Sequence, residues 1–131
     1  MKEWLRGLLG QKGERRAASF LSKKGIKVLA RGVANPFGEI DLVALDGNTI
    51  VFVEVRTRRT TDAGHPAETI TPQKQSRLTR AALAYLKQNK LLDHRSRFDV
   101  VAILWPDGSK SPQIEHYKNA FEPVGLGQFY S

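Results

Sequence analysis

The alternation of apolar and polar residues predicts two β-strands joined by a tight turn near the middle of the chain. Residues 38–45 and 49–58 are rich in β-branched and aromatic side chains, and Asp46-Gly47-Asn48 between them is typical of a hairpin turn. Side chains alternate between the two faces of a strand, and here both faces are largely apolar. We therefore expect this hairpin to lie inside a sheet that is covered on both sides.

The same alternation assigns the charged residues of the hairpin to faces and ends. Glu39 and Asp41 begin the first strand on one face, while Glu54 and Arg56 finish the antiparallel second strand. The apolar neighbours expected on the opposite faces of the two strands are Ile40, Leu42, Ala44, Val51, Val53 and Val55. Because a hairpin brings the start of one strand next to the end of the other, these four charged side chains are predicted to be neighbours.

Three further strands and two helices are predicted around the hairpin. Thr71-Pro72 is typical of a helix start, with threonine as N-cap and proline at the first helical position, and Gly25 is typical of a helix end. The predicted strands cover residues 26–31, 97–105 and 113–117, and the predicted helices cover residues 13–24 and 72–89.

Composition favours one globular domain over residues 1–131, with residues 1–10 as an N-terminal extension and 119–131 as a C-terminal tail. Hydrophobic residues make up 40% of the chain, which is too apolar for a disordered protein. Cysteine is absent, so disulfides and thiolate metal sites are excluded. We find no signal peptide and no membrane-spanning run, and therefore expect a cytoplasmic protein without a membrane partner.

Basic residues dominate the charge. The chain has 21 Lys and Arg against 13 Asp and Glu, which gives a formal net charge of +8. Such a surface attracts polyanions, with nucleic acid, and DNA in particular, as the expected partner. Candidate phosphate contacts are Arg58 and Arg59, which lie at the start of an aperiodic segment, and Arg77 and Arg80 on the second predicted helix.

Acidic residues are concentrated in the hairpin of this basic chain. Residues 38–54 contain Glu39, Asp41, Asp46 and Glu54 and no basic residue. Carboxylates inside strands are costly unless they are compensated, and Mg²⁺ or Mn²⁺ is a hard cation that prefers carboxylate oxygens. The sequence thus predicts a divalent metal site at the open end of the hairpin. The alternative is a cluster of salt bridges with Arg56 and no metal.

Two charged residues fall on otherwise apolar helix stripes. Glu14 lies one turn before the stripe that ends at Leu21, and Lys74 lies four residues before Leu78. Lys74 opposes the helix dipole near a helix N-terminus, and a broken local rule of this kind often marks a functional position. The alternatives are a favourable dipole interaction for Glu14 and a lysine that extends its ammonium to solvent for Lys74.

The order of these motifs resembles that of the YraN-like family of bacterial proteins, which is commonly classed as endonuclease-like. The resemblance covers the chain from about residue 11 to about residue 121. The segments that carry it are Gly13-Glu14, Gly38-Glu39-Ile40-Asp41-Leu42, Phe52-Val53-Glu54-Val55-Arg56-Thr57-Arg58, Lys74 and Arg97-Phe98-Asp99-Val100-Val101. The family in turn looks like the PD-(D/E)xK restriction-endonuclease superfamily and especially archaeal Holliday-junction resolvases. The resemblance implies an α/β fold with a restriction-endonuclease-like core, a central mixed sheet of about five strands flanked by helices.

The resemblance also implies roles for individual residues. Asp41 would be the acid of the first motif, Glu54-Val55-Arg56 would stand at the E-x-K element, and Glu14 would match the helix acid of the resolvase-like branch. Asp41, Glu54 and the Val55 carbonyl would then hold Mg²⁺ or Mn²⁺, and Glu39 and Glu14 would assist.

One position departs from the superfamily pattern, because residue 56 is arginine where the pattern has lysine. Arginine can stabilise charge on a phosphate but cannot serve as a base. Lys74 is our candidate for an ammonium that has moved to another element.

These observations favour a metal-dependent DNA endonuclease, with branched or junction DNA as the implied substrate and Glu14, Glu39, Asp41, Glu54, Arg56 and Lys74 as the catalytic set. The main alternative is a non-catalytic nucleic-acid-binding module whose nuclease site is degenerate at Arg56. A third hypothesis is a structural partner in a DNA- or RNA-processing complex. Junction resolvases act as dimers because a junction has two strands to cut, so the resemblance implies a homodimer as one possible state.

Overall fold

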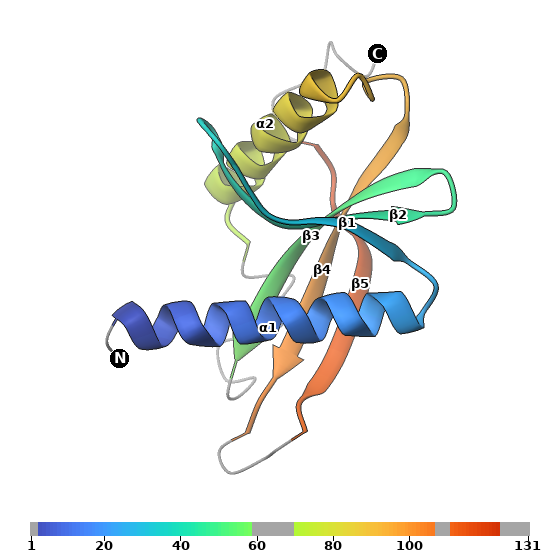
Figure 1. The fold of residues 1–131 in the computed structure, drawn as a ribbon. Coiled ribbons are helices and arrows are strands. Elements are labelled where there is room, and N and C mark those ends of the chain that lie inside the picture. The colour runs from blue at the N-terminus through green and yellow to red at the C-terminus, as the bar shows by residue number, and fades with distance from the viewer. Residues whose placement is uncertain (1–2, 59–69, 107–110, 124–131) are drawn as a thin grey trace.

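Five strands form one mixed sheet, and one helix packs on each of its faces (Figure 1). The structure, a computed structural model, describes residues 3–58, 70–106 and 111–123. In chain order the elements are α1 (Glu3–Lys23), β1 (Lys27–Asn35), β2 (Gly38–Asp46), β3 (Thr49–Arg58), α2 (Pro72–Gln88), β4 (Arg95–Leu104) and β5 (Gln113–Phe121).

The strands lie side by side in the order in which they occur in the chain, β1-β2-β3-β4-β5. Neighbouring strands are antiparallel except β3 and β4, which are parallel and are connected through α2. The prediction of an α/β fold with a mixed sheet of about five strands flanked by helices is confirmed, and the architecture is consistent with a restriction-endonuclease-like core.

The second strand of the central hairpin has the predicted boundaries, and the first strand is one residue longer than predicted because it ends at Asp46. β3 covers Thr49–Arg58, and the last pair before the turn is Asp46 with Thr49. Gly47 adopts a φ of +61°, which glycine tolerates because it has no Cβ to clash with the backbone. Both faces of the hairpin are buried, as expected for strands covered by helices on two sides.

Two apolar clusters fill the spaces between the sheet and the helices. The cluster under α1 consists of Ala17, Leu21, Ile26, Leu42, Ala44, Val51, Val53, Val101 and Ile103. The cluster under α2 consists of Ile40, Val43, Ile50, Phe52, Leu78, Ala81, Ala82, Leu86 and Phe98. Alternate residues of β3 enter opposite clusters, which is the period-2 pattern predicted for this strand.

The first helix is longer than predicted. α1 begins at Glu3, so most of the expected extension over residues 1–10 is continuous with the helix expected over 13–24. The N-terminal segment contains several glycines, which weaken the local helix signal and hide this continuity from a sequence pattern. At the other end Gly25 has a φ of +85° and the Ile26 amide donates to the Leu21 carbonyl at 3.0 Å, which is the predicted helix stop.

The remaining elements agree with the sequence in type and differ in length. α2 begins after Thr71, whose hydroxyl accepts from the Lys74 amide at 3.1 Å, so the predicted N-cap is confirmed. β5 reaches Phe121, four residues beyond its predicted end, and the Phe121 ring stacks on Phe98 with centroids 4.7 Å apart. In the described ranges no helix is long and apolar enough to cross a bilayer.

Candidate metal centre

The two strands of the hairpin separate at their open end. Regular pairing of β2 with β3 ends at Leu42 and Val53. Two residues further along β3, the Val55 amide donates to the Asp41 carboxylate, with 2.8 Å between nitrogen and Oδ2. The Asp41 side chain thus takes the place of a backbone acceptor on β2. We call this end of the hairpin, where β2 and β3 separate beyond Leu42 and Val53, the fork.

This fork changes the face of one predicted residue. Leu42 and Ala44 enter the cluster under α1 and Val43 enters the cluster under α2, as predicted. Ile40 was expected with Leu42, but it packs under α2, so that prediction is wrong. The strict alternation of faces is lost because β2 leaves the ladder with β3 at Asp41.

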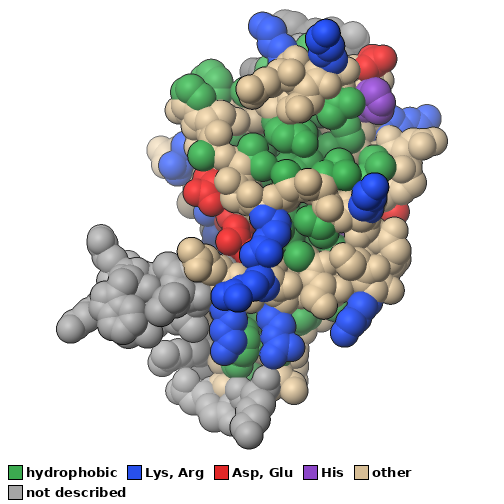
Figure 2. Space-filling model, viewed as in Figure 1, with side chains coloured by type: hydrophobic (Ala, Val, Ile, Leu, Met, Phe, Trp, Pro, Cys, Tyr) green, Lys and Arg blue, Asp and Glu red, His purple; other side chains and the backbone are tan. Residues whose placement is uncertain are grey.

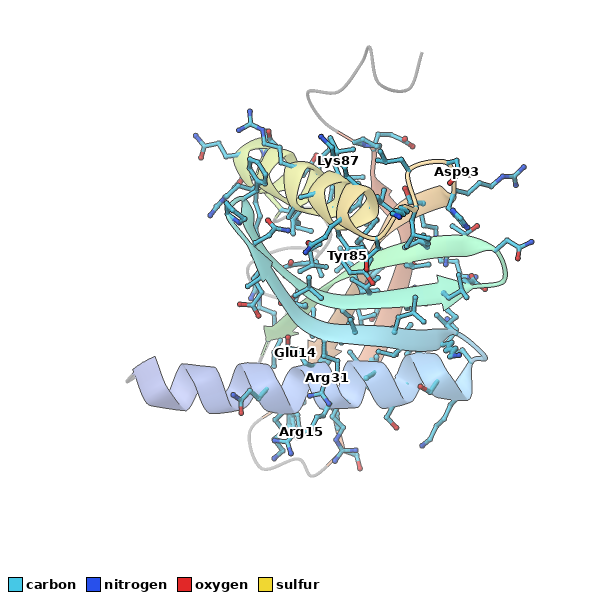
Figure 3. The ribbon with its side chains drawn as sticks, turned by 45° about the horizontal axis from the view of Figure 1, so that its top comes forward. Glu14, Arg15, Arg31, Tyr85, Lys87 and Asp93 are labelled. Carbon is cyan, nitrogen blue, oxygen red and sulfur yellow. The ribbon has the colours of Figure 1, made fainter. Side chains whose placement is uncertain are left out.

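Three carboxylates from two elements meet at the fork. Glu14 from α1 and Glu39 and Asp41 from β2 each offer an oxygen, and these oxygens lie within 4.8 Å of one another. Glu39 is exposed, whereas Glu14 and Asp41 are partly buried. Figure 3 shows Glu14 on the side of α1 that faces the sheet.

The donor set of this acid cluster fits a hard divalent cation. Mg²⁺–oxygen distances are about 2.0–2.1 Å, so ligands on opposite sides of one ion are about 4.2 Å apart. Oxygens within 4.8 Å of one another need only small side-chain movements to reach that spacing. Carboxylate-only ligation favours Mg²⁺ or Mn²⁺ over softer metals, and the chain has no cysteine to compete.

The electrostatics of the cluster show uncompensated negative charge. Burial, and next the nearby Glu54 carboxylate, raises the pKa of Asp41 from 3.8 to about 7, against the hydrogen bond from the Val55 amide. Burial and the neighbouring Glu39 carboxylate also raise the pKa of Glu14, and the Arg31 guanidinium acts in the opposite direction. A bound dication would relieve this repulsion.

The second acid of the predicted motif is paired with a lysine from α2. Glu54 is buried on the α2 side of β3, with a relative exposure of 7%, and the Lys74 ammonium lies 2.9 Å from its carboxylate. Lys74 belongs to the first turn of α2, where a cation opposes the helix dipole. The ion pair with Glu54 compensates this local penalty.

Arg56 and Val55 lie on opposite faces of β3, as the alternation predicts. Arg56 follows Glu54 on the α2 side and is partly buried. Burial, and next the Arg58 guanidinium, lowers the pKa of Arg56, while Glu54 and Asp41 act in the opposite direction. Arginine keeps its charge despite such a shift. The Val55 side chain packs into the cluster under α1, and its backbone amide donates to Asp41.

The close approach of α1 to β3 at Gly13 determines the position of Glu14. Gly13 is buried against β3, and a Cβ at this position would lie 2.6 Å from Thr57 Oγ1. Real Cβ contacts are almost never this short, so a larger residue would require either the Thr57 side chain or α1 to shift. The absence of a side chain at Gly13 therefore allows the next residue, Glu14, to reach Asp41.

The predicted phosphate contacts that the structure describes lie on two elements, β3 and α2. Arg58 at the end of β3 is partly buried, with Nη1 3.3 Å from the Thr57 carbonyl. Arg77 and Arg80 are exposed on α2. Arg59 lies outside the described residues.

A buried polar network around Asp99 on β4 was not predicted. Asp99 on β4 has no solvent exposure, and its carboxylate contacts Arg97 Nε at 2.9 Å, His116 Nε2 at 2.7 Å and the Asn119 amide at 3.1 Å. Burial alone would raise the pKa of Asp99, but the hydrogen bonds from His116, Arg97 and Asn119 lower it. A single acid inside a buried strand, two residues after an arginine, is the sequence signal that could have indicated this network.

A mixed sheet with a helix on each face and an acid cluster at one end of its central hairpin defines an α/β domain consistent with a restriction-endonuclease-like core. The chain belongs to the family described as "Uncharacterised protein family UPF0102", which matches residues 13–103. This agrees with the resemblance to YraN-like proteins, while the superfamily placement rests on that resemblance and on the fold.

Relatives from several bacteria match most of the chain. The UPF0102 protein of Rhodopirellula baltica is 50% identical over 125 residues, which is 93% of this chain and 75% of the relative. The UPF0102 protein of Geotalea daltonii is 47% identical over 114 residues, 87% of this chain and 89% of its own. That of Geobacter sulfurreducens is 47% identical over 117 residues, 88% of this chain and 89% of its own.

Proposed function

We propose that the protein is a metal-dependent endonuclease that hydrolyses phosphodiester bonds in DNA. The observation that carries this proposal is the cluster of Glu14, Glu39 and Asp41 at the open end of the hairpin, next to the Glu54–Lys74 pair. Carboxylates and a cation in this arrangement are the groups that metal-assisted phosphoryl chemistry requires. The basic surface and the resemblance to junction resolvases support DNA, and branched DNA in particular, as the substrate.

The carboxylates at the fork would hold the metal. Asp41 is the central ligand, because it lies in the acid cluster and also interacts with Glu54. Glu14 and Glu39 complete the cluster, and Glu54 and the Val55 carbonyl complete the ligand set that the sequence predicts. When bound, Mg²⁺ or Mn²⁺ supplies Lewis acidity toward a phosphoryl oxygen and lowers the pKa of a bound water.

The two cations on the α2 side would stabilise the negative charge that develops on the phosphate. Lys74 Nζ lies 2.9 Å from Glu54, which supports its assignment as the ammonium missing from position 56. Arg56 offers a fork of donors to a phosphate and stays charged, so it contributes binding rather than proton transfer. Arg58, Arg59, Arg77 and Arg80 are proposed phosphate contacts outside the reacting centre.

A non-catalytic nucleic-acid-binding module is the second candidate, and Arg56 is the observation that favours it. Arginine cannot take the role of the superfamily lysine as a base. In this alternative the basic surface binds nucleic acid, and the carboxylates at the fork do not support cleavage.

Metal titration and DNA cleavage together test the proposal. Calorimetry with Mg²⁺ and Mn²⁺ on wild type, Asp41→Ala and the exposed control Asp93→Ala is combined with cleavage of junction, flap and linear DNA. We expect metal binding and cleavage for wild type and Asp93→Ala and neither for Asp41→Ala. DNA binding by wild type without metal binding or cleavage would reject the nuclease and leave the binding module. If wild type binds no DNA at low salt, both candidates fail.

A further inference from the structure

The outer face of α1 carries a group of exposed basic residues. Lys12, Arg15, Arg16 and Lys23 are all exposed, whereas Gly13, Ala17 and Leu21 of the same helix are buried against the sheet. Their spacing places the four cations on the outward half of the helix. Figure 3 shows Arg15 on the side of α1 opposite to the sheet. We call these four residues the α1 basic face.

Among the residues that the structure describes, the α1 basic face has no acidic counterpart. Between residues 11 and 23 the only acid is Glu14, which faces the sheet. None of the ion pairs among the described residues involves the four cations, while Lys74, Arg97 and Lys118 elsewhere are each paired with a carboxylate. Like charges that are not paired with carboxylates repel one another, and a polyanion would remove this repulsion.

A tryptophan at the end of β4 orders part of this face. The Lys12 ammonium lies 4.5 Å from the centroid of the Trp105 ring, and the Arg16 guanidinium carbon lies 5.6 Å from it. The Trp105 amide donates to the Arg58 carbonyl at 2.7 Å, so Trp105 is held directly after the last residue pair of β3 and β4. Cations held against an aromatic ring lose less conformational entropy when they bind a phosphate.

The α1 basic face is continuous with the acid cluster. Glu14, a member of the cluster, belongs to α1, and the exposed Arg31 on β1 interacts with it. Figure 2 shows blue side chains across the region of α1, next to the red side chains at one edge. From Lys12 to Lys23 the helix rises about 16 Å, which matches roughly five phosphates of one DNA strand along the duplex axis.

We infer that the α1 basic face binds the phosphate backbone of duplex DNA and so determines from which side the substrate approaches the acid cluster. This inference rests on the proposed function and adds to it a binding surface on α1. The geometry favours α1 because the cluster itself is built on this helix through Glu14. A strand whose scissile phosphate lies at Asp41 would continue over Arg15 toward Arg16 and Lys12.

Two charge-matched variants test the inference. The first changes Lys12, Arg15, Arg16 and Lys23 to glutamine, and the control changes four exposed cations outside α1, Lys87, Lys90, Arg95 and Lys118, to glutamine. Each lowers the formal net charge from +8 to +4, because four positive charges are removed from the same chain. Binding of a fluorescein-labelled linear duplex is measured by anisotropy in EDTA over a range of salt concentrations, so that no cleavage interferes.

We expect the α1 variant to lose at least about tenfold in affinity for the duplex. The slope of log K against log salt concentration should become shallower by about 2 to 4, because each lost phosphate contact changes this slope by about 0.9. The control should stay within about threefold of wild type. The double variant Arg15→Gln/Lys23→Gln, which leaves the Trp105 contacts intact, should lose an intermediate amount. Circular dichroism and urea unfolding verify that each variant is folded.

Several results would overturn the inference. These are equal losses in the α1 variant and the control, a larger loss for Arg77→Gln/Arg80→Gln than for the α1 variant, stronger competition by duplex RNA than by duplex DNA, or no binding by wild type. The proposed function has a separate readout, because metal binding and cleavage are measured on wild type. Binding that depends on α1 without metal binding or cleavage would reject the nuclease and keep the inference.

Discussion

Asp41 is the residue on which both the fold and the proposed chemistry depend. Its carboxylate accepts the Val55 amide where the β2–β3 ladder ends, and it also belongs to the acid cluster. Burial and the nearby Glu54 carboxylate raise its pKa to about 7. The folded protein therefore holds a carboxylate whose ionisation opposes folding, which is a common property of functional sites.

Replacement of Asp41 by asparagine should change how stability depends on pH. The folded pKa of about 7 lies above the ordinary value of 3.8, so the folded state keeps this proton longer than the unfolded chain. The free energy of unfolding therefore falls as the pH rises from about 4 to about 7 and stays low above that. Asp41→Asn removes this loss, and should be more stable than wild type by roughly 1–3 kcal/mol at about pH 8 and nearly equal at about pH 4.5.

Urea unfolding in EDTA at the two pH values measures this difference, and Asp93→Asn at an exposed position is the control. Saturating Mg²⁺ should raise the stability of wild type at the higher pH and leave Asp41→Asn unchanged. Equal pH profiles for wild type and Asp41→Asn would contradict the assignment of a destabilising charge to this carboxylate.

Lys74 should stabilise the fold through Glu54. Lys74→Met leaves a buried carboxylate without its cation, and because the lysine is 37% exposed we expect a cost of about 1–2 kcal/mol, below that of a fully buried pair. Urea unfolding of Lys74→Met, Glu54→Gln and the double variant gives the coupling energy. A double variant that is no more stable than Lys74→Met would show that the ion pair does not determine the effect.

At the scale of elements, the contact of α1 with β3 determines the geometry of the acid cluster. The helix approaches the strand so closely at Gly13 that a Cβ would lie 2.6 Å from Thr57 Oγ1. Its distance from Val55 Cγ1 would be 3.7 Å, which is an ordinary van der Waals contact. The obstacle is thus a single hydroxyl oxygen. Because Glu14 follows directly, the packing of one turn of helix and the position of one ligand are coupled.

Gly13→Ala should therefore have opposite effects in two backgrounds. In wild type the clash with Thr57 outweighs the higher helix propensity of alanine, and we expect a loss of about 1–2 kcal/mol together with weaker Mn²⁺ binding. In Thr57→Ala the hydroxyl is absent, and the same change should stabilise by up to about 1 kcal/mol. Urea unfolding and Mn²⁺ calorimetry on the four proteins measure both effects, with the exposed Ser19→Ala as a control for propensity.

A gain in stability from Gly13→Ala in the wild-type background would contradict the close approach of α1 to β3. Unchanged Mn²⁺ affinity in a destabilised Gly13→Ala protein would instead separate the packing of α1 from the position of Glu14.

At the scale of the whole molecule, two groups of charged side chains on the sheet differ in their balance of charge. The open end of the hairpin gathers like charges, whereas Asp99 on β4 is paired with Arg97, which also reaches Asp46 beside the hairpin turn at 2.8 Å. His116 continues this network to Lys24, with 2.8 Å between Nδ1 and Nζ, so the segment that follows α1 contacts β5. We interpret the Asp99 network as structural support for the sheet.

Asp99→Asn should lower stability without affecting the metal site. The hydrogen bonds that lower the pKa of Asp99 stabilise the fold above its unfolded pKa, and their loss leaves buried partners without a counter-charge. We expect a loss of about 3 kcal/mol or more in urea unfolding at neutral pH, with Mn²⁺ affinity of the folded protein unchanged. His116→Gln is a milder variant for the case that Asp99→Asn does not fold. A changed affinity in either folded variant would contradict the separation of the Asp99 network from the acid cluster.

The sequence predicts those features that local patterns encode. The limits of β3, the N-cap at Thr71 and the helix stop at Gly25 follow from alternation and capping, and the structure confirms them. The convergence of Glu39 and Asp41 with residues of the next strand follows from hairpin geometry. Lys74 is identified because it breaks a local rule.

Other features depend on contacts between distant residues. The face of Ile40 changes because the Asp41 side chain takes a backbone hydrogen bond from the neighbouring strand, which no periodicity encodes. The contact of Asp99 with His116 depends on the register between β4 and β5, and the sequence does not define that register. The reach of Glu14 depends on tertiary packing at Gly13.

The central claim is that the carboxylates at the open end of the hairpin bind a divalent metal. The most direct measurement is an anomalous difference map from a crystal soaked in Mn²⁺. We expect a peak bonded to Asp41 and at least one of Glu14, Glu39 and Glu54, and no peak at this position in Asp41→Ala. A fully ordered fork with no peak at saturating Mn²⁺, or a peak only elsewhere on the molecule, would contradict it.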